Sequence, residues 1–411
     1  MRVLLSTYDS RGGVEPLLGL AVQLQVLGAE VVVCAPPDEE FAQRAAGFGV
    51  PLVGFGPSVR AVTTGATRSS EADLRGHVLG LLAAQFDTVA AVAQGCDALV
   101  STSLMWTAAG ARSVADKLGI YYAYASYHPT HLPSPYHPPP EYVGRGMGTS
   151  EIDNRMMWGH NARNANTLFG PTLDSHRAAI GLAPVDDVRA YAYTNHPWLA
   201  ADPTLGPWQQ LADLNVVQTG AWLLHDERPL TAELEEFLAA GTPPVYLGFG
   251  SMPLWGSKEV APMAIEAIRA QGRRVVLSHG WADLALSDDR DDCFAVGEVN
   301  QQALFGRVAA VVHHGGAGTT TTAARAGVPQ LVVPQGADQV YWACRVVELG
   351  IGAACDGPTP PPDSLPAALE VALTDETRAR ASAVAGTIRA DGATVAAQLL
   401  LDAVSREKPR S

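Results

Sequence analysis

Short apolar stretches alternate with helical patterns in both halves of the chain, and this alternation limits the possible folds most strongly. Strands are predicted at residues 2–6, 30–34, 51–53, 98–100 and 120–124, with helices between them. The same alternation resumes over residues 244–333. Strands that alternate with helices form parallel sheets through right-handed crossovers. The sequence therefore predicts an α/β fold with two doubly wound, Rossmann-like domains that face each other across a cleft.

The length of 411 residues exceeds that of one ordinary domain. We expect an N-terminal domain at 1–215, a linker at 216–230, a second domain at 231–390, and a C-terminal helix and tail at 391–411. One segment, 126–148, interrupts the alternation. It is rich in proline, histidine and tyrosine and is too long for a plain connector.

Charge and cysteine usage exclude several classes of function. The net charge is -14 and no long basic tract occurs, which argues against nucleic-acid binding. The 5 cysteines form no CxxC pair, as in a protein of the reducing cytoplasm. We find neither the apolar core of a signal peptide at the N-terminus nor an apolar run long enough to cross a membrane. These features predict a cytoplasmic protein without a membrane partner.

A glycine-rich turn follows the strand expected at 309–313. It contains Gly316 and Gly318, and a helix is expected to begin at Thr319. Unpaired N–H groups and a partial positive charge make a helix N-terminus suitable for phosphate. His314 can donate a hydrogen bond to a departing diphosphate. The third glycine of a dinucleotide fingerprint is missing, which argues against a nicotinamide site. A purely structural turn is the alternative.

Three further loops offer polar groups to a ligand. Ser251 follows the strand at 244–248 and can reach a phosphate or ribose. The run Ser10-Arg11-Gly12 follows the first strand and would face the cleft from the other domain. Asp338 and Gln339 offer an acid and an amide to sugar hydroxyls, although such a pair alone is often only a helix cap. No DxD-type acid pair lies near these loops, so we expect neither a metal nor a cofactor.

These motifs together resemble the donor motif of the family-1 glycosyltransferases, which have the GT-B fold. The matching residues are His314-x-Gly316-x-x-Thr319, Gly327-Val328-Pro329, Pro334 and Asp338-Gln339. Over essentially the whole chain, the sequence is most similar to bacterial enzymes that glycosylate vancomycin- and teicoplanin-type heptapeptide aglycones. Ser10-Arg11-Gly12, His131-Leu132-Pro133-Ser134 and Gly280-Trp281-Ala282-Asp283 contribute to this closer match. The resemblance implies inverting transfer of a sugar from a UDP- or TDP-sugar, which is a substrate, to a hydroxyl of a peptide aglycone.

The resemblance also assigns roles on the donor side. The backbone of Val299 would contact the nucleotide base, and Asp338 and Gln339 would contact the sugar. Many relatives stack a tryptophan on the base near the position of Glu298, and an acid cannot stack in this way. The diphosphate would be held by Ser251, His314, Gly316, Gly318 and Thr319.

The expected general base is missing. Relatives usually carry a histidine or aspartate directly after the glycine of the first loop, where this chain has Gly13. Asp9 is the leading substitute, and Asp9 and Asp338 are the candidate catalytic residues. The alternatives are Glu15 or a histidine at 128, 131 or 137, a phenolic acceptor that needs a weaker base, or a chain that binds without catalysis. The predicted acceptor residues are Tyr127, His128, His131 and Tyr136.

Two other functions fit parts of this pattern. A nucleotide-sugar epimerase shares the two-domain architecture, but it would not need the long aromatic segment. A non-catalytic, donor-binding helper protein would explain Gly13, but not a complete donor motif.

Overall fold

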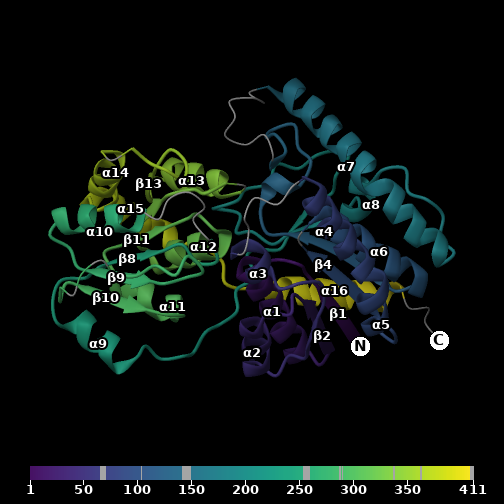
Figure 1. The fold of residues 1–411 in the computed structure, drawn as a ribbon, viewed down its shortest axis with the longest axis horizontal. Helices are drawn as coiled ribbons and strands as arrows, with labels where there is room; N and C mark the ends of the chain where they lie inside the picture. The colour runs from purple at the N-terminus through teal and green to yellow at the C-terminus, as the bar shows by residue number, and fades with distance from the viewer. Residues whose placement is uncertain are drawn as a thin grey trace. The chain divides into compact units, whose positions relative to one another are not determined.

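The computed structural model describes residues 1–64, 71–102, 104–140, 150–252, 260–286, 288, 290–336, 338–361 and 363–407. The chain divides into two compact units (Figure 1). Unit 1 comprises Met1–Pro203, Pro207–Leu224 and Arg389–Ser411, and unit 2 comprises Thr204–Gly206 and His225–Ile388. The chain thus leaves unit 1, builds unit 2, and returns to unit 1 with its last helix.

Unit 1 is built on a parallel sheet of 7 strands in the order β3-β2-β1-β4-β5-β6-β7. The strands are β1 (Arg2–Ser6), β2 (Glu30–Ala35), β3 (Leu52–Gly54), β4 (Ala98–Thr102), β5 (Tyr121–Ser126), β6 (Trp198–Leu199) and β7 (Val217–Gln218). The helices include α1 (Arg11–Val26), α2 (Glu39–Gly47), α3 (Val59–Thr64), α4 (Glu71–Ala84), α5 (Ala90–Val92), α6 (Met105–Leu118), α7 (Glu151–Ala179), α8 (Val188–Tyr193) and α16 (Gly392–Glu407).

Unit 2 has a parallel sheet of 6 strands in the order β10-β9-β8-β11-β12-β13. The strands are β8 (Val245–Gly248), β9 (Val275–Ser278), β10 (Cys293–Val296), β11 (Ala310–His313), β12 (Gln330–Val332) and β13 (Gly352–Ala354). The helices include α9 (Ala232–Ala239), α10 (Val260–Ala270), α11 (Gln301–Leu304), α12 (Ala317–Ala326), α13 (Gln339–Glu348), α14 (Ser364–Ala372) and α15 (Asp375–Ala385).

Both sheets reverse their strand order at an internal point. In each unit the chain starts in the middle of the sheet, builds outward on one side, and then returns to build the other side. The predicted α/β fold class with two doubly wound units is therefore confirmed. Ligands of such sheets bind beyond the carboxyl ends of the two strands where the order reverses. Those strands are β1 and β4 in unit 1, and β8 and β11 in unit 2.

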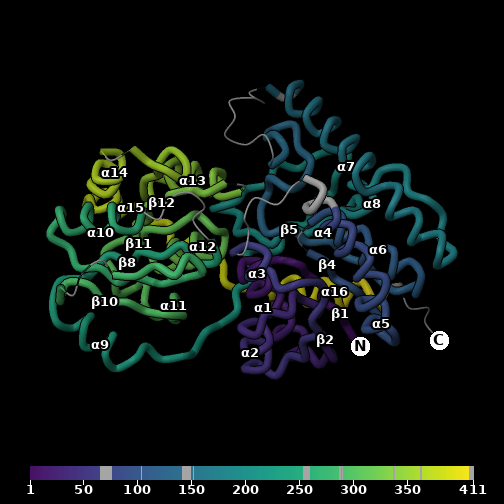
Figure 2. Tube along the Cα trace, in the orientation of Figure 1, coloured from purple at the N-terminus to yellow at the C-terminus, as the bar shows by residue number. Residues whose placement is uncertain are grey.

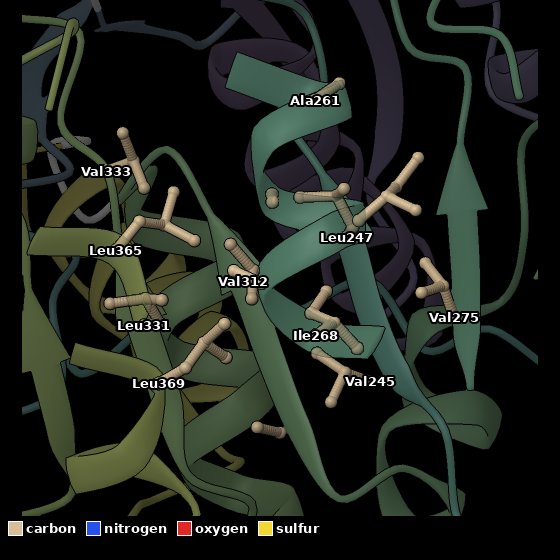
Figure 3. Packing of buried hydrophobic residues seen from close by; sticks show 14 of the residues in the cluster. Val245, Leu247, Ala261, Ile268, Val275, Val312, Leu331, Val333, Leu365 and Leu369 are labelled. Carbon is tan, nitrogen blue, oxygen red and sulfur yellow. The ribbon is translucent and has the colours of Figure 1, made fainter. Parts of the chain in front are cut away.

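The strands are almost wholly apolar because helices cover both faces of each sheet. In unit 2, Val245, Leu247 and Val312 pack with Ile268 of α10 and Leu369 of α14, and all five side chains are fully buried (Figure 3). The residues that alternate with them along β8 and β11 pack into a second cluster on the other face. Each such side chain contributes about 1.5–3 kcal/mol by leaving water.

The C-terminal helix α16 belongs to unit 1, where it packs against α1. Figure 2 shows its yellow trace among the purple and blue segments of that unit. The hydroxyl of Thr394 donates to the side-chain carbonyl of Gln23 at 2.9 Å. A methyl group at Gly392 would lie 2.4 Å from the backbone carbonyl oxygen of Ala221, so only glycine fits where this helix begins.

One long element has no counterpart in the sequence expectations. Helix α7 has 29 residues and includes Pro171 in its interior. It begins after Ser150, whose hydroxyl accepts the backbone N–H of Asp153 at 3.1 Å and so caps the helix. Among the described residues, no helix is both long and apolar enough to cross a membrane.

Candidate active site

The glycine-rich turn of unit 2 has the predicted strand–turn–helix geometry. Strand β11 ends at His313, Gly315 has a φ of 90°, and Gly316 precedes the first residue of α12. The backbone N–H groups in the first turn of a helix have no partner within that helix. The N–H groups of Ala317, Gly318 and Thr319 are therefore presented together beyond the carboxyl end of β11, as phosphate binding requires.

His313 fixes the shape of this turn from inside the core. Its Nδ1 accepts the backbone N–H of Gly315 at 3.1 Å, so its Nε2 carries the proton and donates to Oε1 of Gln330 at 2.9 Å. The side chain is fully buried, and burial lowers its pKa from 6.5 to about 3. This role of His313 was not predicted from the sequence. A histidine at the end of a strand, two residues before a run of glycines, is the only signal for it.

His314 follows in the same turn and is half-buried. Burial lowers its pKa to about 4, while the charge of Asp338 opposes this shift, so the imidazole is neutral near neutral pH. Its Nδ1 is buried and has no hydrogen-bond partner among the described residues. A methyl group at Gly316 would lie 2.5 Å from Nε2, so Nε2 faces the first turn of α12. A neutral imidazole in this place can donate one hydrogen bond to an anion without a metal.

The loop after β8 lies against His314. Gly250 has a φ of 56°, and a methyl group at this position would come within 3.3 Å of Cε1 of His314. The carbonyl of Gly250 accepts the N–H of Trp281 at 2.9 Å. Ser251, the next residue in this loop, is half-buried. The structure thus brings together two predicted donor-binding loops that are more than sixty residues apart in the sequence.

Asp338 and Gln339 have different surroundings. Asp338 immediately precedes α13, but its side chain makes no capping hydrogen bond, and its Oδ2 accepts the indole N–H of Trp342 at 3.0 Å. Gln339 is 7% exposed, and its Oε1 accepts the N–H of Gln335 at 2.7 Å. The Gln339 amide therefore shapes the loop that contains Asp338. The charge of Asp338 raises the pKa of His314 against the effect of burial, so these two predicted residues lie close enough to interact.

The loop predicted to contact the nucleotide base of the donor contains an ion pair. Nη1 of Arg228 lies 2.7 Å from Oε1 of Glu298, and Arg228 also pairs with Asp226 at 2.6 Å. Asn300 does not belong to this ion pair. Its side-chain amide donates to the backbone carbonyls of Asp226 and Arg228. Val299, between Glu298 and Asn300, is half-buried. Glu298 is thus engaged with a guanidinium, in the place where the resemblance implies an aromatic ring.

In unit 1, the predicted first loop joins β1 to α1. Ser10 precedes α1, and Arg11 is its first residue. Oδ1 of the half-buried Asp9 accepts the N–H of Ser10 at 2.6 Å. A methyl group at Gly13 would lie 2.6 Å from Oδ2 of Asp9. The Asp9 carboxylate therefore occupies the space in which a side chain at position 13 would begin, while a methyl group at Gly12 would meet only the Ser10 hydroxyl, at 3.8 Å.

Glu15, one of the alternative bases, is held by two cations. Arg11 and Arg44 each donate to its Oε1 at 2.9 Å. The carboxylate lies within α1 and does not cap it, because it interacts with guanidinium groups. Its interactions favour a structural role.

The predicted acceptor residues differ in exposure. Tyr127 donates its hydroxyl to the carbonyl of Gly13 at 2.9 Å, and burial raises its pKa. His128 is buried, its Nδ1 lies 2.8 Å from the hydroxyl of Thr130, and its ring centroid is 3.9 Å from that of the half-buried His131. Tyr136 is 46% exposed. The first three side chains therefore lie near the segment that leaves β5, and Tyr136 presents its ring to solvent.

Burial makes two of the alternative histidine bases weak. It lowers the pKa of His128 to about 3 and that of His137 to about 4. A general base works best when its pKa lies near the operating pH. His128 and His137 are therefore poorly suited to take a proton near neutral pH.

Comparison with known proteins agrees with this geometry. Residues 285–397 match the family model described as Erythromycin biosynthesis protein CIII-like, C-terminal domain. A vancomycin aglycone glucosyltransferase of Amycolatopsis orientalis is 59% identical over 409 residues, which span 100% of this chain and 99% of the relative. A dTDP-epi-vancosaminyltransferase of the same organism is 53% identical over 415 residues, with 100% and 99% covered. The chain belongs to this family of glycopeptide glycosyltransferases.

Solved structures agree on the fold of this glycosyltransferase. The glycosyltransferase VinC, in complex with DTDP, matches with a TM-score of 0.70 at 22% identity, over 99% of this chain and 100% of that chain. Such a distant likeness bears on the fold alone. Among the described residues of this glycosyltransferase, no group of three or more histidine, cysteine or acidic side chains could hold a metal ion.

Proposed function

We propose that this glycosyltransferase moves a sugar from a UDP- or TDP-sugar to a hydroxyl group of a heptapeptide aglycone, with inversion at the anomeric carbon. The observation that carries the proposal is the 59% identity, over the whole chain, to an enzyme named for glucose transfer to the vancomycin aglycone. A second full-length relative is named for transfer from a dTDP-linked sugar. The first name gives the acceptor, the vancomycin aglycone, and the second gives a different sugar, linked to dTDP, as the donor.

The donor site supports this proposal. The N–H groups of Gly316, Gly318 and Thr319, with the hydroxyl of Ser251, would hold the diphosphate. Nε2 of the neutral His314 would donate to the leaving diphosphate, where a preorganised donor stabilises the developing charge. Asp338 would accept hydrogen bonds from the sugar hydroxyls. The remaining donor contacts are proposed as the sequence predicts them. Ser10, Arg11 and Gly12 would approach the donor from the first loop. Gln339 would contact the sugar, and the backbone of Val299 would contact the nucleotide base.

We assign removal of the acceptor proton to Asp9. The support is local: its carboxylate fills the space at which a side chain on Gly13 would begin, and position 13 is where the resemblance expects a base. The Tyr127 hydroxyl holds the carbonyl of Gly13 and so fixes this turn. An aspartate at position 9 then supplies the carboxylate that position 13 lacks.

Moving the carboxylate from position 9 to position 13 tests the assignment of Asp9 as the general base. Asp9→Asn is expected to lower kcat about 100-fold, the usual contribution of a general base. Gly13→Asp alone should also be impaired, because the added side chain collides with Asp9. The double variant Asp9→Gly/Gly13→Asp should recover activity well above that of Asp9→Asn. If Asp9→Asn keeps the parental turnover while His128→Ala abolishes it, the assignment is wrong.

Mass spectrometry of the products tests the function itself. The protein is incubated with vancomycin aglycone and, separately, with UDP-glucose, UDP-N-acetylglucosamine and TDP-deoxysugars. A gain of one sugar on the aglycone supports the proposal. Epimerised donor without acceptor would instead identify an epimerase, and donor binding without any turnover would identify a helper protein.

A further inference from the structure

Unit 1 contains a cavity of about 420 Å³ that none of the roles above uses. It lies between the segment 133–135, the first turns of α7, the end of α8, and residues 211–214. Its volume falls within the range of pockets that hold small ligands or single side groups of larger ones. Its walls are largely rings and apolar side chains: Pro133, Pro135, Trp158, Tyr193, Leu211 and Leu214.

The two aromatic walls are fixed by the protein itself. Trp158 is 5% exposed, and its indole N–H donates to the carbonyl of His137 at 2.9 Å. The guanidinium of Arg189 lies over the Trp158 ring, 5.4 Å from its centroid. Tyr193 stacks on Tyr124 with ring centroids 4.4 Å apart. A ligand ring would therefore enter a preformed slot and would not have to order these side chains, which reduces the cost of binding.

The charged groups of the cavity differ from the walls. Arg189 is occupied, because it donates to the backbone carbonyl of Trp158 and to the side chain of Asn161. Arg155 and Asp213 also line the cavity, and neither forms an ion pair or hydrogen bond with any residue in the described part of the chain. A protein with a net charge of -14 has many carboxylates for an arginine to pair with, yet Arg155 pairs with none of those that the structure describes.

These groups match one kind of ligand. A guanidinium binds a carboxylate through two parallel hydrogen bonds. A carboxylate such as that of Asp213 accepts the O–H of a phenol. The flat, ring-lined walls suit an aromatic side group. An aromatic amino-acid residue with a free carboxylate beside it satisfies all three requirements.

We propose that this cavity binds an aromatic residue of the peptide acceptor together with the adjoining carboxylate, which Arg155 holds. The inference rests on the proposed function, because it takes the acceptor to be a peptide. The wall residues Pro133 and Pro135 follow His131 within a few residues, so the cavity extends the segment predicted to bind the acceptor. Arg155 contacts the acceptor away from the reacting hydroxyl, and it therefore governs acceptor affinity.

The test compares Arg155→Gln with the parent on vancomycin aglycone and on its carboxamide. For the aglycone, Arg155→Gln should raise KM about tenfold, the loss of one charge-assisted hydrogen bond, with kcat and the donor KM unchanged. For the carboxamide, KM should already be raised in the parent, and the variant should raise it no further. Lys117→Gln removes the same charge from an exposed position of unit 1 and should leave KM unchanged.

Quenching of tryptophan fluorescence by the acceptor gives the same comparison without turnover, so binding is measured even if the parent transfers no sugar. If the parent transfers no sugar to any acceptor, the proposed function fails. If transfer occurs but Arg155→Gln weakens binding of the carboxamide as much as binding of the aglycone, or weakens binding of neither, the inference about the cavity is overturned.

Discussion

Acidification should loosen the donor turn through His313. This imidazole is fully buried and neutral, with Nδ1 accepting from Gly315 and Nε2 donating to Gln330. A second proton on Nδ1 would face the N–H of Gly315, donor against donor. Burial disfavours the charged imidazolium and lowers the pKa from 6.5 to about 3, with a smaller lowering from His314.

The size of the effect follows from proton linkage. The folded pKa lies below the unfolded one, so the unfolded state gains protons first as the pH falls. The stability contributed by neutral His313 is complete above the unfolded pKa of 6.5 and is lost progressively down to the folded pKa of about 3. Integrated from about pH 7 to about pH 5, the loss is about 2 kcal/mol.

The variant His313→Asn isolates this contribution. The asparagine oxygen can still accept from Gly315, but the side chain cannot titrate. It should cost about 1–2 kcal/mol at neutral pH, because the bond to Gln330 is lost. Its stability should then fall about 2 kcal/mol less than that of the parent between about pH 7 and about pH 5.

Hydrogen exchange of peptides covering β11 and α12, measured in urea at both pH values, reports this local stability. His225→Asn changes a histidine of the same unit whose side chain is 78% exposed, and it should leave the pH dependence of the parent unchanged. Equal losses in the parent and in His313→Asn would refute the linkage argument.

Three other substitutions test the packing. Gly316→Ala should weaken TDP binding at least about tenfold in calorimetry, because its methyl would lie 2.5 Å from the adjacent imidazole, whereas Gly306→Ala, with open space around it, should not. Gly392→Ala places a methyl 2.4 Å from the carbonyl of Ala221 and should lower the stability of unit 1 by about 2 kcal/mol, seen as a fall in Tm. Arg177→Met removes a 6% exposed guanidinium bonded to side chains of α6 and α8, and denaturation should show a loss of about 3 kcal/mol.

Features set by neighbouring residues could be predicted from the sequence. The turn at 314–318 was predictable because a strand, glycines and a helix start follow one another directly, and local geometry alone forms the site. The strands at 2–6 and 245–248 were predictable from their unbroken apolar runs. Helix α7 was missed, since its 29 residues mix polar and apolar side chains without a clear stripe.

Features that depend on distant residues could not be predicted. Nothing in the sequence places Gly250 against His314, because the contact exists only when β8 and β11 pair in the sheet. The overlap of Asp9 with the space above Gly13 depends on how the chain enters α1. The same holds for Glu15, which could be a base or a cap by sequence and is held by Arg44 only after α2 has packed against α1.

The sequence by itself determined the two doubly wound sheets, the glycine turn between β11 and α12, and the family, because each depends on local patterns or on matching residues along the chain. The tertiary structure decided which groups are buried, paired or neutral. It alone set the protonation of His313 and His314, the contacts of Glu298 and Glu15, the return of α16 to unit 1, and the cavity beside Arg155. These properties depend on side chains that meet only after folding, when burial and hydrogen bonding fix the charge of each group.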